Sequence, residues 1–357
     1  MSMHLRFIDP CAPRAYSDLD DMHGLGGTES TLIRIATDLG RDITVTVEQA
    51  ARQDAESRTG IDFLPLNLKR AAGDVIVVLN SWKAALVSRK HNPTAQIFVW
   101  QHVIPGKHNR VMGRDLAAAG IEILCVSQSH AMMVSSFLSG QVRVTAVPNP
   151  ISDTLQPDAT MRDPDLLFFA SSPHKGLDQV AAAFATLRKS IPSLRLEIAD
   201  PGYLAWDNGT MPEGAESLGT LTHNQVIAKM RQALCIFYPQ SRFVETFGLV
   251  IAEANAVGCP ALVQWGLGAN NEVTSTSDQC VDASNPSEIL ERIVAWRHRP
   301  PVVMLHSHFR QSAIVERWHR LLVRSRISDD MPADTNGKPL WVPHGHPIWE
   351  RALGRAS

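Results

Sequence analysis

Short apolar runs alternate with amphipathic stretches along the first 150 residues of the chain. Runs of this length, rich in β-branched residues, predict buried strands, here at Leu5–Asp9, Ile43–Val47, Asp74–Asn80, Ala95–His102, Ile121–Ser127 and Val142–Asn149. Between several of these runs the apolar spacing changes to a helical period, as in Ser30–Leu39 and Ser129–Leu138. Strands that alternate with helices predict a doubly wound α/β domain with a parallel sheet.

The same alternation restarts after a polar, proline-bearing stretch at residues 149–158. The second half predicts strands at Asp165–Ser171, Leu194–Asp200, Cys235–Pro239 and Cys259–Gln264, and helices at Leu177–Ser190, His223–Ala233, Gly248–Val257 and Ser287–Arg297. We therefore expect an N-terminal Rossmann-like domain over 1–150 and a C-terminal one over 151–327. Residues 303–326 are expected to form helical closing segments, and 328–357 a tail that either packs back on the body or stays partly mobile.

Composition supports two ordinary globular domains. A chain of 357 residues is long for one core, and 44% hydrophobic with 20% charged residues is typical of globular proteins. The formal net charge of -2 gives no overall field that would favour nucleic acid.

Cysteine usage and the apolar runs also indicate a location. The five cysteines are scattered and form no C-x-x-C pair, which favours free thiols in a reducing compartment. The chain start does not resemble a signal peptide, and no apolar run approaches the roughly 18 residues that cross a bilayer. The expected location is the cytoplasm, with peripheral contact at the inner face of the membrane left open.

The most informative segment is residues 239–263, which predicts a strand end, a loop, a helix and a further strand. Glu245 precedes the helix and Glu253 lies two turns along it, so both carboxylates can approach a ligand at the helix N-terminus. The unpaired N–H groups of residues 246–249 favour an anion there. Taken alone, however, such a pair is more often a helix cap and a solvated helix residue.

The segment ETFGLVIAEANAVGCPALV resembles the Glu-x7-Glu signature of the family 4 retaining glycosyltransferases, the glycosyl transferases group 1. Other segments resemble the same family in the same order along the chain, with gaps: GLGGTES, WQH, VSQSHA, VPNPIS, FFASSPHKGLDQV and LGTLTHNQVIAKMRQALCIFYP. The resemblance implies a GT-B fold, in which two Rossmann-like doubly wound parallel-sheet domains face a central cleft. It also implies that the C-terminal domain binds most of a nucleotide-sugar.

The resemblance assigns roles to matching residues of the C-terminal half. Lys175 and the N-terminus of the signature helix would neutralise the diphosphate of the donor. Glu253 would bind the ribose hydroxyls and Glu245 the hydroxyls of the donor sugar, since carboxylates accept hydrogen bonds from diols. Backbone amides of Phe247, Gly248 and Leu249 would complete the phosphate cradle.

One position departs from the family pattern. An Arg is usual about five residues before Lys175, but Ala170 stands there, followed by Ser171 and Ser172. Arg242, in an unusually long loop between the strand-ending proline and Glu245, is a candidate replacement, which the sequence leaves open.

The N-terminal half carries weaker candidates. The segment Gly24–Ser30 is read equally well as a plain tight turn, but the resemblance makes it the loop over the donor phosphate, with Gly26 and Gly27 in contact. His102 ends a predicted strand, where ligands of α/β folds gather, and a lone His is otherwise structural. Asn80, with Ser81 and Trp82, would face the same acceptor region, whereas Ser127 and Asn149 are expected to be cleft or linker residues.

Four further motifs are not assigned a ligand role. Asp18-Leu-Asp20 matches a metal motif of another glycosyltransferase fold but falls in a loop. The pairs His306/His308 and His344/His346 lack a Cys or acidic partner at metal-ligand spacing. The basic stretch 317–326 is read as a closing helix in preference to a membrane-contacting one.

The resemblance therefore implies a metal-independent, retaining hexosyltransferase (EC 2.4) that moves a sugar from a UDP- or GDP-linked donor to an acceptor hydroxyl, in glycan, lipopolysaccharide or glycolipid synthesis. The nucleotide-sugar is a co-substrate, no cofactor or metal is expected, and the acceptor is a saccharide, a lipid-linked or a small molecule. The predicted catalytic residues are Glu245, Lys175 and His102. The predicted donor-binding residues are Gly26, Gly27, Ser172, Lys175, Arg242, Glu245, Thr246, Phe247, Gly248, Leu249 and Glu253, with Asn80, Trp82 and His102 on the acceptor side.

Three alternatives stay open. A GT-B sugar-nucleotide epimerase or a phosphorylase would share the two lobes and the cleft carboxylates. A non-catalytic protein that binds nucleotide-sugars or glycans is favoured by Ala170 in place of the usual Arg.

Overall fold

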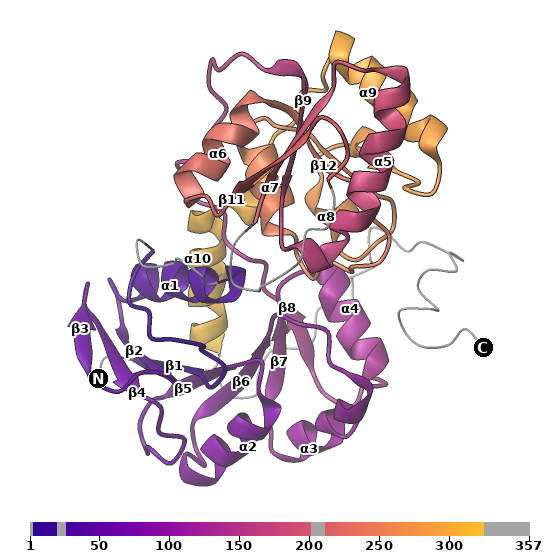
Figure 1. Cartoon of the computed structure of the whole chain (residues 1–357). Helices are drawn as coiled ribbons and strands as arrows, with labels where there is room; N and C mark the ends of the chain where they lie inside the picture. Colours follow the sequence, from indigo (N-terminus) through magenta and orange to yellow (C-terminus); the bar gives the residue numbers. More distant parts are fainter. Residues whose placement is uncertain (1–2, 20–25, 201–210, 325–357) are drawn as a thin grey trace. The chain divides into compact units, whose positions relative to one another are not determined.

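The computed structural model describes residues 3–19, 26–200 and 211–324. The predicted tail 328–357 lies outside the described residues. Within the described residues the chain divides into two compact units, one of 3–17, 34–148 and 314–324 and the other of 18–19, 26–33 and 149–313, without 201–210. Each unit contains one sheet (Figure 1).

The first unit has an eight-stranded sheet in the order β3-β4-β2-β1-β5-β6-β7-β8, in which only β3 is antiparallel to its neighbour. Its strands are β1 (His4–Asp9), β2 (Thr44–Gln49), β3 (Glu56–Arg58), β4 (Ile61–Pro65), β5 (Val75–Leu79), β6 (Gln96–Gln101), β7 (Glu122–Cys125) and β8 (Val144–Ala146). The chain runs from β1 towards β4 and then returns to β5 on the other side of β1. This reversal, between β1 and β5, is the topological switch point of a doubly wound sheet.

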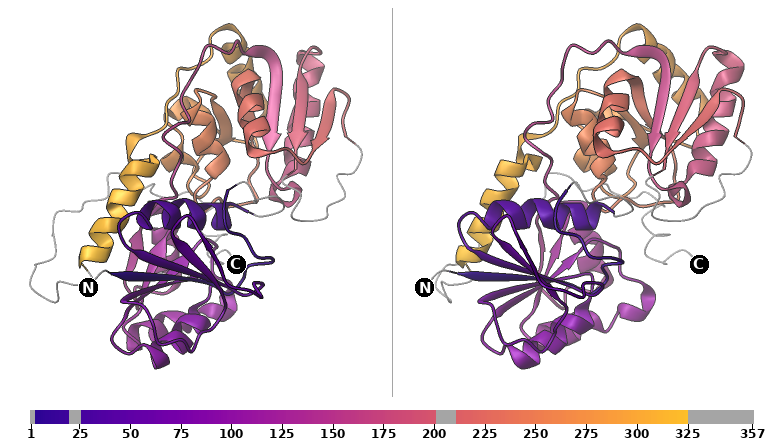
Figure 2. Two further views of the ribbon diagram at one scale, coloured as in Figure 1. Left: turned by 90° about the vertical axis from the view of Figure 1, so that its left-hand side faces the viewer. Right: turned by 60° about the vertical axis from the view of Figure 1, so that its left-hand side comes forward.

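Helices cover both faces of this sheet. They are α1 (Gly27–Leu39), α2 (Trp82–His91), η1 (Lys107–Asn109), α3 (Met112–Ala118), α4 (Gln128–Phe137) and α10 (Gln311–Arg324). One face packs against α2, α3 and α4 through alternate strand residues such as Ile8 and Val78. The helix α10 lies beside the sheet on its other side (Figure 2). There Phe7 and Trp100 pack edge-on or tilted against each other and against the fully buried Trp318 of α10.

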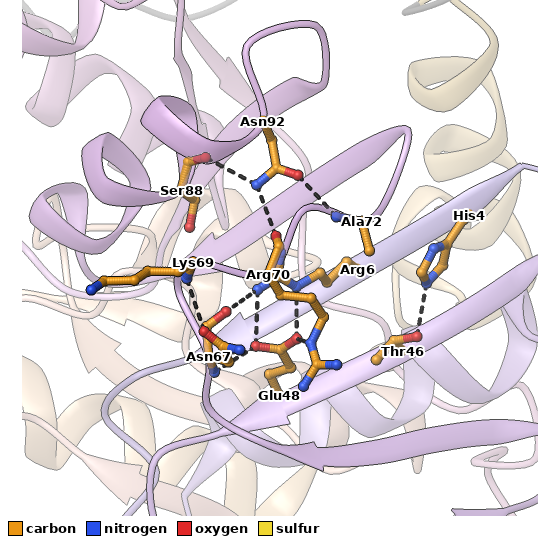
Figure 3. A network of polar contacts seen from close by, with 10 residues as sticks. All are labelled: His4, Arg6, Thr46, Glu48, Asn67, Lys69, Arg70, Ala72, Ser88 and Asn92. Atoms are coloured by element: carbon orange, nitrogen blue, oxygen red, sulfur yellow. Dashed lines mark hydrogen bonds and ion pairs between the residues drawn. The ribbon is translucent and has the colours of Figure 1, made fainter.

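A buried polar network joins β1 and β2 to the segment before β5 (Figure 3). The guanidinium of Arg6 donates to both carboxylate oxygens of the fully buried Glu48, at 2.9 Å each. Glu48 also accepts from Nε of Arg70 and the backbone N–H of Asn67, and Arg6 donates to the carbonyls of both. Because every charge is paired and hydrogen-bonded, the network fixes the path of residues 67–70 without leaving a buried ion unpaired.

The second unit has a six-stranded parallel sheet in the order β11-β10-β9-β12-β13-β14. Its strands are β9 (Asp163–Ala170), β10 (Arg195–Ala199), β11 (Ala215–Gly219), β12 (Ala233–Tyr238), β13 (Ala261–Gln264) and β14 (Cys280–Val281). Its helices are η2 (Pro173–Lys175), α5 (Leu177–Ser190), α6 (His223–Gln232), α7 (Leu249–Ala256), α8 (Asn270–Val273), η3 (Ser277–Gln279), α9 (Pro286–His298) and η4 (Ser307–Phe309). The helices α5 and α9 pack together, as do α6 and α7, on opposite faces of the sheet (Figure 1). The switch point lies between β9 and β12.

The predicted alternation of strands and helices is confirmed in both units. The sequence did not predict β3 and β4, because Glu56–Arg58 is polar and Ile61–Pro65 alternates buried and exposed residues over only one edge of the sheet. In the predicted closing region, 303–306 is irregular, and the regular helix is α10, with a short turn before it.

Candidate functional site

The candidate donor site gathers at the carboxyl end of the two strands that flank the switch point of the six-stranded sheet. Strand β9 ends at Ala170 and leads into η2, whose last residue is Lys175. Strand β12 ends at Tyr238 and leads through a loop to Glu245 and α7. Because these strands are neighbours and parallel, both loops emerge at the same edge, where open α/β sheets bind ligands.

Lys175 and Glu245, which are 70 residues apart in the chain, form an ion pair. The ammonium nitrogen lies 3.2 and 3.4 Å from the two carboxylate oxygens. The side chain of Lys175 is 21% exposed and that of Glu245 10% exposed, so both are largely buried. The buried hydroxyl of Tyr238 donates to Oε1 of Glu245 at 3.0 Å. The structure therefore brings Lys175, predicted to bind the diphosphate, into direct contact with Glu245, predicted to bind the donor sugar.

The N-terminus of α7 follows Glu245 directly. Gly248, with φ of +87°, is the residue before the helix, and such a left-handed conformation favours glycine. Phe247 is buried and packs edge-on against Phe309, with 5.2 Å between ring centroids. Thr246 and Leu249 are partly exposed beside it. The turn is thus held by the packing of Phe247, and a helix N-terminus of this kind favours an anion.

Glu253 lies further along α7 and pairs with His223 at the start of α6. Nε2 of His223 is 2.8 Å from Oε1 of Glu253, and the carboxylate side chain is 14% exposed. The imidazole donates this hydrogen bond, because the carboxylate can only accept it. Glu253 keeps acceptor capacity for a diol on its second oxygen.

Arg242 forms an ion pair with Asp178. Nη1 of Arg242 lies 2.5 Å from Oδ2 of Asp178, and both side chains are more than half exposed. Whether Arg242 replaces the usual arginine, which the sequence leaves open, stays a prediction. Ser172 is buried, and its carbonyl accepts from the N–H of Lys175 at 2.9 Å, so its role here is to close the turn of η2.

The glycine segment is described from Gly26 onward. The N–H of Gly26 donates to the carboxylate of Glu29 at 3.0 Å, and Gly27 is the first residue of α1. A Cβ at Gly27 would overlap the side chain of Leu249. The close approach explains glycine at this position, and it places Gly27 beside the start of α7 within the second unit.

The predicted acceptor residues belong to the first unit. Oδ1 of Asn80 accepts from the N–H of His102 at 2.7 Å, and Asn80 has φ of +51°. Ser81 caps α2 by accepting from the N–H of Ala84, and Nε1 of Trp82 donates to Asn109 at 3.1 Å. The structure therefore brings Asn80 and His102 together and engages Trp82 with the loop after β6.

His102 and His130 are both buried and neutral. Burial lowers the pKa of His102 to about 3, with a smaller contribution from the charge of His130. Burial also lowers the pKa of His130 to about 4, against a hydrogen bond to the carbonyl of Val103 that raises it. Both pKa values lie below the usual 6.5 of unfolded chains, so below about pH 6.5 the unfolded state binds more protons than the folded state. The stability of the folded protein therefore decreases as the pH is lowered below about 6.5.

The remaining residues named from the sequence have structural roles. Ser127 caps α4 by accepting from the N–H of His130, and Asn149 is buried at the start of the second unit. His306 and His308 stack on each other beside Phe309.

Asp20, His344 and His346 lie outside the described residues. Across 3–19, 26–200 and 211–324, no cluster of three or more His, Cys, Asp or Glu side chains is arranged to hold a metal ion.

Three contacts of the site were not predicted from the sequence, namely those of Tyr238, His223 and Phe243. Tyr238 is a hydroxyl at the end of an otherwise apolar strand, which is a signal that sequence reasoning could have used. His223 looks like an ordinary first residue of a capped helix. Phe243 lies with its ring under the ammonium of Lys175, 4.5 Å from the centroid, which no spacing in the sequence indicates.

Comparison with known proteins finds a family match for part of the chain. Residues 159–313 match the family described as glycosyl transferases group 1. Among curated proteins, none matches this chain in sequence.

Solved structures with the same fold cover nearly the whole chain. Sucrose-phosphate synthase from Thermosynechococcus elongatus is 15% identical over 90% of this chain and 98% of its own, with a TM-score of 0.62. HepE from Anabaena, solved with UDP-glucose, is 15% identical over 90% of this chain and 100% of its own, with a TM-score of 0.63. The lipopolysaccharide outer core galactosyltransferase WaaB is 13% identical over 90% of this chain and 99% of its own, with a TM-score of 0.60.

The fold is therefore GT-B, as predicted. The segment 159–313, which contains Lys175, Glu245 and Glu253, matches the glycosyl transferases group 1, in agreement with the resemblance found in the sequence. Among the helices of the described residues, none combines the length and the apolar character needed to cross a bilayer.

Proposed function

We propose that the protein transfers a hexose from a UDP- or GDP-linked sugar to an acceptor hydroxyl, with retention of configuration and without a metal ion. The second unit would bind the donor and the first unit the acceptor. The acceptor would be a growing glycan, a lipopolysaccharide or another glycolipid, or a small molecule. Five free thiols, four of them buried, support a reducing, cytoplasmic setting.

The convergence of Lys175 and Glu245 beside the N-terminus of α7 carries this proposal. As the bond between the anomeric carbon and the diphosphate breaks, negative charge grows on the leaving phosphate oxygens. The ammonium of Lys175 and the N–H groups at the start of α7 would stabilise that charge. Glu245 would hold sugar hydroxyls so that the acceptor attacks from the face that the diphosphate leaves.

The acceptor side is supported by the neutral state of His102. An imidazole whose pKa is lowered to about 3 stays uncharged throughout the physiological range. It can donate or accept a hydrogen bond with a sugar hydroxyl, but it is a weak general base. We therefore propose that His102 orients hydroxyl groups of the sugar. Asn80 helps to place it by accepting a hydrogen bond from the backbone N–H of His102.

Thermal unfolding with nucleoside diphosphates and their sugars tests the donor. HepE was solved with UDP-glucose, so UDP and UDP-glucose come first, followed by GDP and its sugars. A ligand at one hundred times its Kd stabilises by about 2.7 kcal/mol, which raises Tm by roughly 5–10 °C in a unit of this size. Incubation of the stabilising donor with acceptor panels, followed by NMR of the anomeric proton, then tests transfer and its stereochemistry. No stabilisation by any nucleotide, and neither transfer nor donor hydrolysis, would contradict the proposal.

A non-catalytic nucleotide-sugar-binding protein is the second candidate. It is favoured by Ala170 and by the pairing of Arg242 with Asp178, which together leave Lys175 as the cation nearest Glu245 among the predicted ligands. Tight binding of a nucleoside diphosphate without any turnover of its sugar would support it. Turnover with inorganic phosphate, or epimerisation of the donor sugar, would instead indicate the phosphorylase or epimerase reaction.

A further inference from the structure

Lys175 has an aromatic neighbour in addition to its carboxylate partner. The ammonium nitrogen lies 4.5 Å from the centroid of the Phe243 ring. An ammonium over a ring face at this distance is attracted by the electron-rich face of the ring. The ring of His174 packs edge-on against the same Phe243, with 5.7 Å between centroids. Phe243 therefore lies between the two basic residues that end η2.

The loop that carries Phe243 is held from within by Gln240, whose side chain is fully buried. Oε1 of Gln240 accepts from the N–H groups of Arg242 and Phe243, at 2.9 and 2.8 Å. Nε2 of Gln240 donates to the carbonyl of Phe243 at 2.9 Å. One side chain thus satisfies both backbone groups of Phe243, which fixes the residue in place.

The same loop is attached to the turn that carries Lys175. Ser241 and Gln179 exchange two hydrogen bonds, of 3.0 Å from the N–H of Ser241 and 3.3 Å from the amide of Gln179. Arg242 adds its ion pair with Asp178 in the first turn of α5. A Cβ at Gly176 would lie 2.8 Å from the side chain of Gln240, so loop and turn pack without a gap. These contacts hold the loop 240–243 against the end of η2 and the first turn of α5.

We propose that Phe243 is the positioning residue for Lys175 in donor binding, and that the unusually long loop before Glu245 serves to place it. The proposal rests on the proposed function, because it assigns Lys175 to the diphosphate. When a diphosphate attracts the ammonium, the carboxylate of Glu245 competes for it, whereas the neutral ring holds the ammonium without offsetting its charge. The ring thereby limits the freedom of a flexible side chain in a site where Ala170 replaces the usual second cation.

Three variants test the proposal by calorimetric titration with UDP and GDP. Phe243→Leu keeps apolar packing but removes the ring face, and it should weaken binding of the preferred nucleoside diphosphate about five- to tenfold. Phe243→Tyr keeps the ring and should bind within about twofold of wild type. In the Lys175→Met background, Phe243→Leu should have no further effect, because the interaction that it removes is already absent.

The outcomes separate the proposal from the function on which it rests. If wild type binds UDP or GDP and Phe243→Leu binds it equally well, the positioning role is refuted and donor binding stands. A loss of nucleotide affinity in Phe243→Leu that persists in the Lys175→Met background would also refute it. The ring would then affect binding through the local structure and not through Lys175. If wild type binds no nucleoside diphosphate, the proposed function fails and the inference with it. Phe243 is half-buried on a loop, and Phe243→Met provides a second ring-free variant if the leucine variant does not fold.

Discussion

Substitution of Glu245 by glutamine should change donor binding in two opposite directions. In the unliganded protein the carboxylate of Glu245 neutralises Lys175, so a diphosphate must compete with it for the ammonium. The amide of glutamine keeps the shape and can still accept the hydrogen bond from Tyr238. We expect Glu245→Gln to bind the nucleoside diphosphate more tightly and to transfer sugar more slowly.

The magnitude follows from the geometry of the pair. Unit charges 3.2 Å apart attract by about 5 kcal/mol at an effective dielectric constant of about 20. Partial exposure of both groups and the cost of desolvation reduce the net value to about 1–2 kcal/mol, equivalent to roughly 5- to 30-fold in Kd. Loss of charge-assisted hydrogen bonds to the sugar costs about 1.5–3 kcal/mol, which corresponds to a rate at least about tenfold lower.

Isothermal titration of wild type and Glu245→Gln with UDP and GDP measures the first effect, and initial rates with the matching nucleotide-sugar measure the second. Glu253→Gln is the matched control, because this carboxylate pairs with His223 and not with Lys175. The control should not bind the diphosphate more tightly. Equal or weaker binding of the diphosphate by Glu245→Gln would refute the competition between Glu245 and the phosphate.

Three other predictions concern Arg242, the buried histidines and a glycine turn. Arg242→Ala removes an exposed ion pair and should change the Kd for UDP or GDP by less than about twofold, whereas a tenfold loss in the titration would assign this cation to the diphosphate. His130→Gln should lessen the loss of stability on acidification, because the pKa of His130 is lowered to about 4 by burial. In urea unfolding the variant should lose about 2–3 kcal/mol less than wild type between pH 6.5 and 4.5, and identical slopes would exclude a buried neutral imidazole. Gly176→Ala would place a Cβ at φ of +93° where it overlaps a neighbouring side chain, and it should lower the free energy of unfolding in urea by about 2–4 kcal/mol. The matched control Gly120→Ala, at φ of +61° in open space, should lower it by only about 1 kcal/mol. Equal costs would show that the overlap at Gly176 is relieved.

The sheet core was predictable because its strands are short apolar runs bounded by turns. Strands such as β5 and β9 are buried on both faces, so their sequences carry a continuous signal. The strands β3 and β4 at the sheet edge do not, because only two of their eight residues, both in β4, are buried. The order of strands around each switch point also has no local signal, since it depends on pairings between distant segments.

The candidate site was predictable as a set of residues but not as an arrangement. The signature motif locates Glu245 and Glu253 through the helix that joins them. The pair of Lys175 with Glu245 spans 70 residues and exists because β9 and β12 are neighbours. The partner of Arg242 depends on a loop conformation fixed by a buried amide, and loop conformations of this kind have no period to read.

The position of Trp318 has a consequence for biosynthesis. This side chain from the last described helix fills the core between Phe7 and Trp100, with centroids 5.9 and 4.9 Å away. A ribosome that has released only the first half of the chain has made every strand of that sheet, but not the indole that covers it. The N-terminal unit therefore cannot complete its folding during translation until the whole second unit has been synthesised. Chains that end before this helix should expose two large aromatic rings, and such chains are expected to aggregate or to be degraded.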